Sequence, residues 1–263
     1  MNELPGMGGV SDNKNFIRNY DDWSLIPYGP FQKNIDEKNY DLRVAPMTGA
    51  VENMGFPDEK KFYLDFVKYC SEKKYLLSIG DGCPDTKLLW GVEALQKLAQ
   101  KASVFIKPYP QNKIWERFEL SLSQSESMGI DIDSYNILTM RNKVNLEKKT
   151  ASQLIEIKKY LNSKGLPFII KGVFTLDDIK LVQEVMPDVA YISNHGGRVE
   201  TEEGSTAFFL KNHSETLLNS CGEIWIDGGI RNRGQEEKAL SYGVSCVLKG
   251  RPFIAEFIKS IYN

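Results

Sequence analysis

The stretch ISNHGGRVE, Ile192–Glu200, contains one of the two histidines in this 263-residue chain and an arginine shortly after it. Histidine changes charge near neutral pH, so an imidazole in this loop could take up or release a proton during a reaction. The forked guanidinium of Arg198 could bind a carboxylate. The alternative is a polar residue in an ordinary glycine turn. Which applies depends on where the stretch lies in the fold.

Two glycine turns near the C-terminus suit an anion. They are DGGIR, Asp227–Arg231, and GRP, Gly250–Pro252. Glycines let backbone N–H groups approach a phosphate closely, and a guanidinium or a helix N-terminus adds positive potential. A lone Gly-Gly pair is more often a simple turn. Two such turns after two successive apolar runs favour a phosphate site.

Lys171 and Asp133 each end a short run that reads as a strand, PFIIK and GIDID. A lysine at the end of a strand is commonly just solvated, but beside an electron-accepting ring it would stabilise developing negative charge. A carboxylate next to a histidine would orient the imidazole and stabilise its protonated form. Both residues are therefore candidates for the same site as His195.

Short apolar runs rich in Val, Ile, Leu and aromatic residues alternate with helical patterns from residue 40 onward. This alternation predicts βα units around a parallel sheet, and eight units favour a (β/α)8 barrel, whose active site lies at the C-terminal ends of its strands. The eight predicted strands are Tyr40–Ala45, Tyr75–Ile79, Ser103–Lys107, Gly129–Asp133, Pro167–Lys171, Ala190–Ser193, Glu223–Asp227 and Cys246–Gly250.

The predicted helices include residues 58–73, 86–102 and 152–165. Thr175 and Asn232 are candidate N-caps of later helices. Because no linker or repeat divides the chain, we expect one barrel domain over residues 40–263, preceded by an irregular lead-in over residues 1–39.

Composition excludes several classes of protein. The formal net charge is −2, from 33 basic and 35 acidic residues, so no overall field favours nucleic acid or an anionic membrane. The four cysteines form no zinc-type cluster, and no metal site is predicted. No run reaches the roughly 18 apolar residues that a bilayer span needs, and the N-terminus does not read as a signal peptide. We therefore expect a soluble cytoplasmic protein.

With these motifs in order, the chain resembles the FMN-dependent α-hydroxy-acid dehydrogenases and oxidases, which include glycolate oxidase and lactate oxidase. The resemblance is strongest over residues 167–257, where IIKGVFTLDDIKLV, ISNHGGRVE, IWIDGGIRNRGQEEKALSYG and VLKGRPFI follow the family's order. VAPMTGA, IGDG, IKPY and DID match more weakly in the N-terminal half, and Ile17–Asp21 (IRNYD) resembles a segment of short family members.

The resemblance implies oxidation of a small L-2-hydroxy acid to the 2-keto acid, with FMN accepting the electrons. His195 resembles the general base, Arg198 the carboxylate-binding residue and Asp133 the carboxylate behind the histidine. Lys171 resembles the lysine beside the flavin, and Tyr109 an active-site tyrosine. The residues implied to bind FMN are Ala45, Pro46, Thr48, Lys107, Asp131, Lys171, Ser193, Asp227, Gly228, Gly229, Arg231, Gly250 and Arg251.

The chain departs from the family pattern at several points. Thr201 stands where an aspartate usually follows the arginine, and Glu200 could replace that charge only if the loop shifts. Asp131 and Lys107 replace a threonine and a glutamine. Arg141 is the nearest candidate for a second carboxylate-binding arginine.

The N-terminal tyrosine of the larger oxidases has only Tyr20 and Tyr28 as possible counterparts. These departures leave two alternatives open. One is a barrel that binds FMN or another phosphate ligand without oxidase activity, in a binding or regulatory role. The other is a flavin-dependent isomerase. The resemblance also implies a homo-oligomer.

Overall fold

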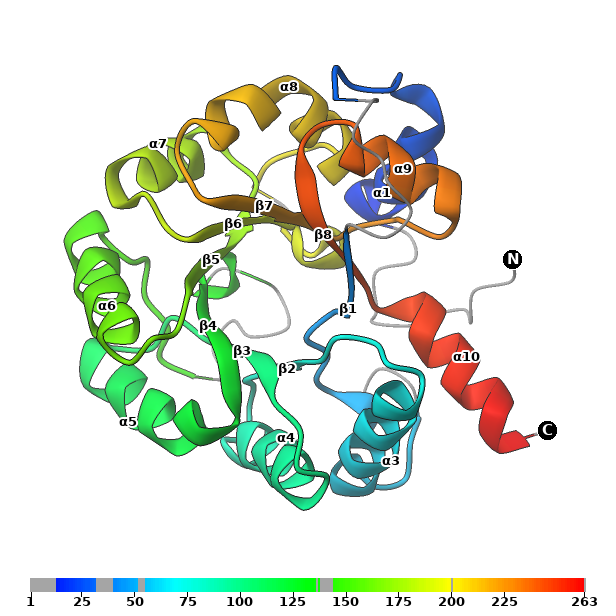
Figure 1. Cartoon of the computed structure of the whole chain (residues 1–263), viewed down its shortest axis with the longest axis vertical. Helices are drawn as coiled ribbons and strands as arrows, with labels where there is room; N and C mark the ends of the chain where they lie inside the picture. Colours follow the sequence, from blue (N-terminus) through cyan, green and yellow to red (C-terminus); the bar gives the residue numbers. More distant parts are fainter. Residues whose placement is uncertain are drawn as a thin grey trace.

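Eight parallel strands form one sheet that curls until its edge strands meet (Figure 1). The computed structural model describes residues 13–31, 40–51, 55–135, 137, 144–199 and 201–262. The strands are β1 (Asp41–Val44), β2 (Ser78–Gly80), β3 (Ala102–Ile106), β4 (Ser125–Asp131), β5 (Phe168–Val173), β6 (Val189–Ile192), β7 (Glu223–Ile226) and β8 (Val244–Lys249).

In the strand order β1-β8-β7-β6-β5-β4-β3-β2, each strand from β2 onward lies beside the next in sequence, and β1 lies beside β8. The two edges approach each other through a parallel bridge between Arg43 and Leu76. In the same contact the Val44 N–H donates to the Leu76 carbonyl at 2.9 Å. The predicted (β/α)8 barrel, with all eight predicted strands, is confirmed.

Helices surround this sheet on the outside (Figure 1). Thr175 caps α7 as predicted, because its hydroxyl accepts from the Asp178 N–H while the Asp178 carboxylate accepts from the Thr175 N–H. Asn232 caps α9 in the predicted place. The described helices of the barrel are α3 (Glu59–Glu72), α4 (Thr86–Lys97), α5 (Gln111–Ser121), α6 (Ala151–Ser163), α7 (Leu176–Val185), α8 (Thr206–Leu218), α9 (Arg233–Leu240) and α10 (Arg251–Tyr262).

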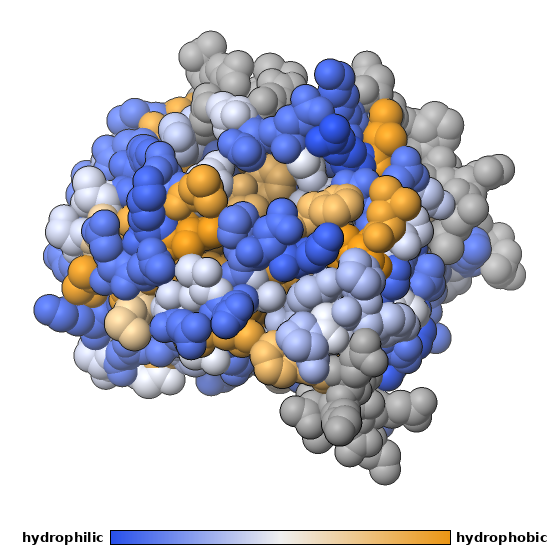
Figure 2. All heavy atoms as spheres, turned by 90° about the horizontal axis from the view of Figure 1, so that it is seen from above, coloured by the Kyte–Doolittle hydropathy of each residue, from blue (hydrophilic) through white to orange (hydrophobic). Residues whose placement is uncertain are grey.

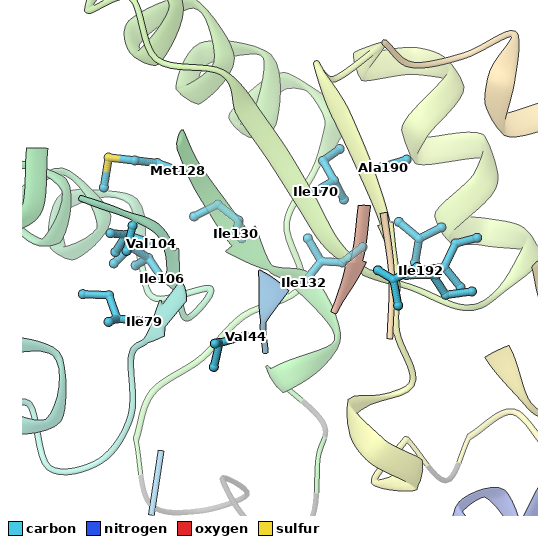
Figure 3. Packing of buried hydrophobic residues seen from close by; sticks show 14 of the residues in the cluster. Val44, Ile79, Val104, Ile106, Met128, Ile130, Ile132, Ile170, Ala190 and Ile192 are labelled. Atoms are coloured by element: carbon cyan, nitrogen blue, oxygen red, sulfur yellow. The ribbon is translucent and has the colours of Figure 1, made fainter. Parts of the chain in front are cut away.

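The main core lies between the strands and the helices. Alternate strand residues point outward into it, and Figure 3 shows the side chains of Val104, Ile130 and Ile170 among those that fill this layer. A smaller apolar cluster fills the inside of the barrel, formed by Phe105, Ile169, Val189, Tyr191, Trp225, Cys246 and Leu248. The barrel interior is therefore packed with side chains below its mouth.

The expected irregular lead-in is wrong over residues 14–25, which form helix α1 (Lys14–Leu25). The Asn13 side chain caps this helix by accepting from the N–H groups of Asn15 and Phe16. Its apolar residues Ile17, Tyr20 and Leu25 are exposed, whereas Asn15, Asn19 and Asp22 lie on the buried face with Trp23. The apolar residues therefore do not mark the side of the helix that faces the barrel. Helix α1 contacts the loop after β6 as well as α8 and α9.

Among the described residues, none of the helices combines the length and apolar character that a membrane crossing needs. Figure 2 shows one face of the molecule, where most residues are hydrophilic and some hydrophobic residues are exposed between them. Such scattered apolar groups are normal on a folded surface.

Candidate active site

Polar side chains collect at the mouth of the barrel because strand side chains alternate between its two faces. Phe105, Ile169, Tyr191 and Trp225 point into the inner apolar cluster. The next inward positions, two residues further along each strand, lie at its C-terminal end. These positions hold Lys107, Lys171, Ser193 and Asp227, all of which the resemblance assigned to cofactor binding.

Asp131 lies between two ammonium groups. Its Oδ2 accepts from Lys107 Nζ at 2.5 Å and its Oδ1 from Lys171 Nζ at 2.7 Å. All three side chains are buried, with only 4–7% of each exposed to solvent. The structure thus joins the two residues that depart from the family pattern, Lys107 and Asp131, into one ion pair that also includes Lys171.

The charges in this cluster set its ionisation. Burial disfavours a charged Asp131, but the ammonium groups of Lys107 and Lys171 outweigh it and hold the pKa of that carboxyl well below its usual range. Burial and the neighbouring Asp131 charge raise the pKa of Asp133. The Lys171 pKa is raised because nearby carboxylates outweigh the effect of burial on the ammonium. Asp131 is therefore the more acidic of the two carboxyl groups.

His195 lies against Asp133. Its Nδ1 is 3.2 and 3.3 Å from the two carboxylate oxygens, and 3.6 Å from Asp131 Oδ1. An Nδ1 directed at carboxyl groups leaves Nε2 as the ring atom available to a substrate. Burial, followed by the charges of Lys171, Lys107 and Arg198, lowers the His195 pKa, and the Asp131 charge only partly opposes them. The imidazole is therefore neutral at neutral pH, the form that can accept a proton.

The loop that carries His195 has an unusual backbone. His195, Gly196 and Gly197 have φ values of 57°, 66° and 92°, all in the left-handed region. The loop is closed by the His195 N–H donating to Ser193 Oγ at 3.2 Å and by Arg198 Nη1 donating to the His195 carbonyl at 3.0 Å. A non-glycine residue in this region is strained and needs support from its surroundings.

Gly172 allows Asp133 to approach β5. Its φ is +96°, and a Cβ atom there would lie 2.6 Å from Asp133 Cγ. A side chain at this position would push Asp133 away from His195. Behind the pair lies a cavity of about 260 Å³ whose lining includes Asp133, Gly172 and Thr201.

This gives a first testable prediction. Gly172→Ala should destabilise the fold more than Gly165→Ala, a matched control with φ +74° and no neighbouring atom within 4 Å of the added Cβ. The control should lose about 1–2 kcal/mol from the left-handed backbone alone. Gly172→Ala adds the clash with Asp133. Urea unfolding measures both, and equal losses would show that Asp133 is not held in place by this contact.

The two glycine turns lie beside helix α1. Gly228 and Gly229 have φ values of 95° and 81°, so the backbone there uses the freedom of glycine. Arg231 lies 5.9 Å from the Tyr20 ring, and Arg251 lies 4.4 Å from the Phe16 ring. Both predicted phosphate arginines thus flank the same helix, and Arg251 begins α10.

The remaining predicted cofactor residues occupy other parts of the mouth. Ala45 packs against the inner apolar cluster, and Pro46 and Thr48 lie beside Gly80 at the end of β2. The Tyr191 hydroxyl donates to Asp227 Oδ2 at 2.7 Å, and Lys171 Nζ lies 5.4 Å from the Tyr191 ring. Asp227 is thereby linked to the charged cluster.

Tyr109 packs against helix α5 and not against the His195 cluster. Its ring is covered by Lys113 and Arg117 of α5 at 4.4 and 5.3 Å, and its described contacts are with these residues rather than with His195. Its hydroxyl is buried and has no hydrogen-bond partner among the described residues. Arg141 and Glu200 lie outside the described residues.

Helix α1 was missed in the prediction of the site. Asn15, Asn19 and Trp23 all hydrogen-bond to the loops after β6 and β7. The Asn13 cap, followed by a helix-compatible run that ends in a tryptophan, was the signal present in the sequence.

Asp131, Asp133 and His195 also lie close enough together to share a metal ion, with one ligand atom from each within 4.8 Å of the others. Two ammonium groups already pair with Asp131, and their charges oppose the binding of a cation. The absence of a metal site stays a prediction.

Comparison with known proteins adds to this geometry. A family model described as FMN-dependent dehydrogenase matches residues 96–258. The chain is 33% identical over 89 residues to 2-hydroxyacid oxidase 2 of Rattus norvegicus, and 30% identical over 115 residues to L-lactate oxidase of Lactobacillus jensenii. These alignments cover 34% and 41% of this chain, but only 25% and 28% of those proteins.

Solved structures share the fold. A flavocytochrome b2 double mutant with sulfite bound has a TM-score of 0.70 at 20% identity, covering 98% of this chain and 70% of that one. A mandelate oxidase mutant with (S)-mandelic acid has a TM-score of 0.65 at 16% identity, covering 91% and 76%.

Proposed function

Because the chain belongs to the family of FMN-dependent dehydrogenases, we propose that it oxidises a small L-2-hydroxy acid to the 2-keto acid. The single observation that carries this proposal is the pair of His195 and Asp133, which lies next to the ion pair of Asp131 with the Lys171 ammonium. The pair supplies a neutral base, and the ammonium supplies a fixed positive charge where an electron acceptor would gain negative charge.

The donor set fits FMN. The phosphate would be held by the turns at Gly228–Gly229 and Gly250, with Arg231 and Arg251 beside them. At the other side of the mouth, the buried Lys171 ammonium, held by Asp131, would place positive charge beside the ring. When bound, FMN would accept the two electrons and the α-hydrogen of the substrate.

The protein residues would act on the remaining proton and on the carboxylate. His195 Nε2 would accept the hydroxyl proton of the substrate. Asp133 would hold Nδ1 in place, and the charge of Asp131, 3.6 Å from the same nitrogen, would stabilise the imidazolium that results. Arg198, on the same loop, would bind the substrate carboxylate after exchanging its hydrogen bond to the His195 carbonyl.

The proposal is tested on the purified protein by anaerobic titration with lactate, glycolate and longer 2-hydroxy acids. The flavin absorption should bleach with one of these acids, and the matching keto acid should form in equal amount. Flavin that stays oxidised across the whole panel would overturn the proposal and favour a barrel that binds FMN without oxidising hydroxy acids, or a flavin-dependent isomerase.

We also propose a cytoplasmic location and a homo-oligomeric assembly. All four cysteines, Cys70, Cys83, Cys221 and Cys246, are free, which suits a reducing compartment. The proposal of a homo-oligomer rests on the resemblance to the family.

A further inference from the structure

We infer that Asn19 is a positioning residue that fixes the loop bearing His195 and Arg198 against the Gly228–Gly229 turn. The effect of Asn19 on catalysis rests on the proposed function. The contacts of Asn19 with the His195 loop are independent of that function. Asn19 itself has no other assigned role in this chain.

Asn19 and Asn194 form a reciprocal pair of amides. Asn19 Nδ2 donates to Asn194 Oδ1 at 2.6 Å, and Asn194 Nδ2 donates to Asn19 Oδ1 at 3.0 Å. Only 2% of Asn19 and none of Asn194 is exposed to solvent. Asn194 is the residue directly before His195, so this pair holds the start of the loop that carries His195.

The same oxygen atoms hold further backbone groups. Asn194 Oδ1 also accepts from the Gly197 N–H at 3.0 Å, and Asn19 Oδ1 also accepts from the Thr206 N–H at 3.1 Å. Both side-chain carbonyls therefore use two acceptor positions, which is their full capacity. Loss of one amide would leave several buried polar groups without partners, which is costly.

The loop needs this support. Its three left-handed residues include the non-glycine His195, and its own Arg198 N–H to His195 carbonyl contact is long, at 3.4 Å. A short stretch with a strained backbone keeps one conformation only if neighbouring groups fix it.

Asn19 also touches the other half of the site. A Cβ atom on Gly229 would lie 1.5 Å from the Asn19 carbonyl oxygen, so helix α1 and this turn are in direct contact. Thr206, whose N–H is held by Asn19, donates through its hydroxyl to the Gly228 carbonyl at 3.1 Å. Trp23 Nε1 donates to the same carbonyl at 2.7 Å. Asn19 thus connects the loop that carries His195 with the Gly228–Gly229 turn, where the phosphate is proposed to bind.

The test uses Asn19→Ala in the purified holoenzyme, with Asn19→Asp as a second variant of nearly the same shape. Asn19→Asp keeps the acceptor for Thr206 but loses the donor to Asn194. Arg18→Ala is the matched control, because Arg18 is the neighbouring residue on α1 but is exposed and pairs with Glu203 on the surface.

The first measurement is the ¹⁵N shift of the His195 ring nitrogens in histidine-labelled protein, assigned with His213→Gln because the chain has only two histidines. We expect a single ring tautomer in the wild type and the control. Both Asn19 variants should show a mixture. An unchanged His195 tautomer in either folded variant would overturn the inference, whether or not a hydroxy acid is turned over.

The second measurement is kinetic, on the hydroxy acid that reduces the flavin. A misplaced catalytic group can lower a rate about 100-fold, so we expect kcat to fall by 10-fold or more in both variants, with the control unchanged. Variants with wild-type kcat would overturn the positioning role. If no hydroxy acid reacts with the wild type, the proposed function fails while the tautomer measurement still decides the role of Asn19.

Discussion

Replacing His195 with glutamine is expected to lower the rate of hydroxy-acid oxidation by about 10²–10⁴-fold, the usual contribution of a general base. Glutamine can keep a hydrogen bond to Asp133, but its amide cannot take up the substrate proton. Single-turnover flavin reduction under anaerobic conditions measures the step directly, because it does not depend on the later electron acceptor.

His213→Gln is the matched control for this experiment. His213 lies on α8 with its ring 4.8 Å from Phe209, away from the charged cluster, so its replacement should leave the rate unchanged. A His195→Gln enzyme with the wild-type rate would remove His195 from the reaction and leave Lys171 and Asp133 without the role proposed for them.

Asp131→Asn is expected to lower the free energy of unfolding by about 3–5 kcal/mol, because removing one partner of a buried ion pair leaves charge uncompensated. Here the loss affects both Lys107 and Lys171, and the new amide N–H₂ would face one of the ammonium groups. Urea unfolding at neutral pH measures the change. Asp65→Asn, which breaks the exposed pair with Lys61, should change stability by less than about 0.5 kcal/mol.

The effect of Asp131→Asn should also depend on pH in a defined direction. The folded pKa of Asp131 is lowered, so its contribution is present above the unfolded pKa of about 3.9 and is lost as pH falls through the folded value. The difference between wild type and variant should therefore be largest near neutrality and shrink below about pH 4. A difference that grew in acid would mean that Asp131 is not the ionised member of the cluster.

The barrel could be predicted from sequence because its signals are local. Each strand is a short apolar run, and the helix starts at Thr175 and Asn232 are set by side chains that cap N–H groups a few residues away. Strand ends in a barrel share one mouth, so polar residues such as Lys171 and Asp133, each at the end of a predicted strand, could be assigned to one site.

Helix α1 could not be predicted in the same way. Its buried face carries Asn15 and Asn19, whose partners lie more than 170 residues away in the chain. An asparagine that faces a loop backbone is indistinguishable in sequence from one that faces solvent. The structure alone shows that this face is covered by the loops that carry the proposed base and the phosphate turn.

The sequence by itself determined the fold, the family motifs and the position of His195 at the mouth, since these depend on periodicity and on residue types at strand ends. Only the tertiary structure decided how the charges are shared. Asp131 meets Lys107 and Lys171 across separations of 24 and 40 residues, and it takes both ammonium groups while Asp133 faces the imidazole. Two carboxylates two positions apart look alike in sequence, but their ionisation depends on which charges the barrel brings next to each.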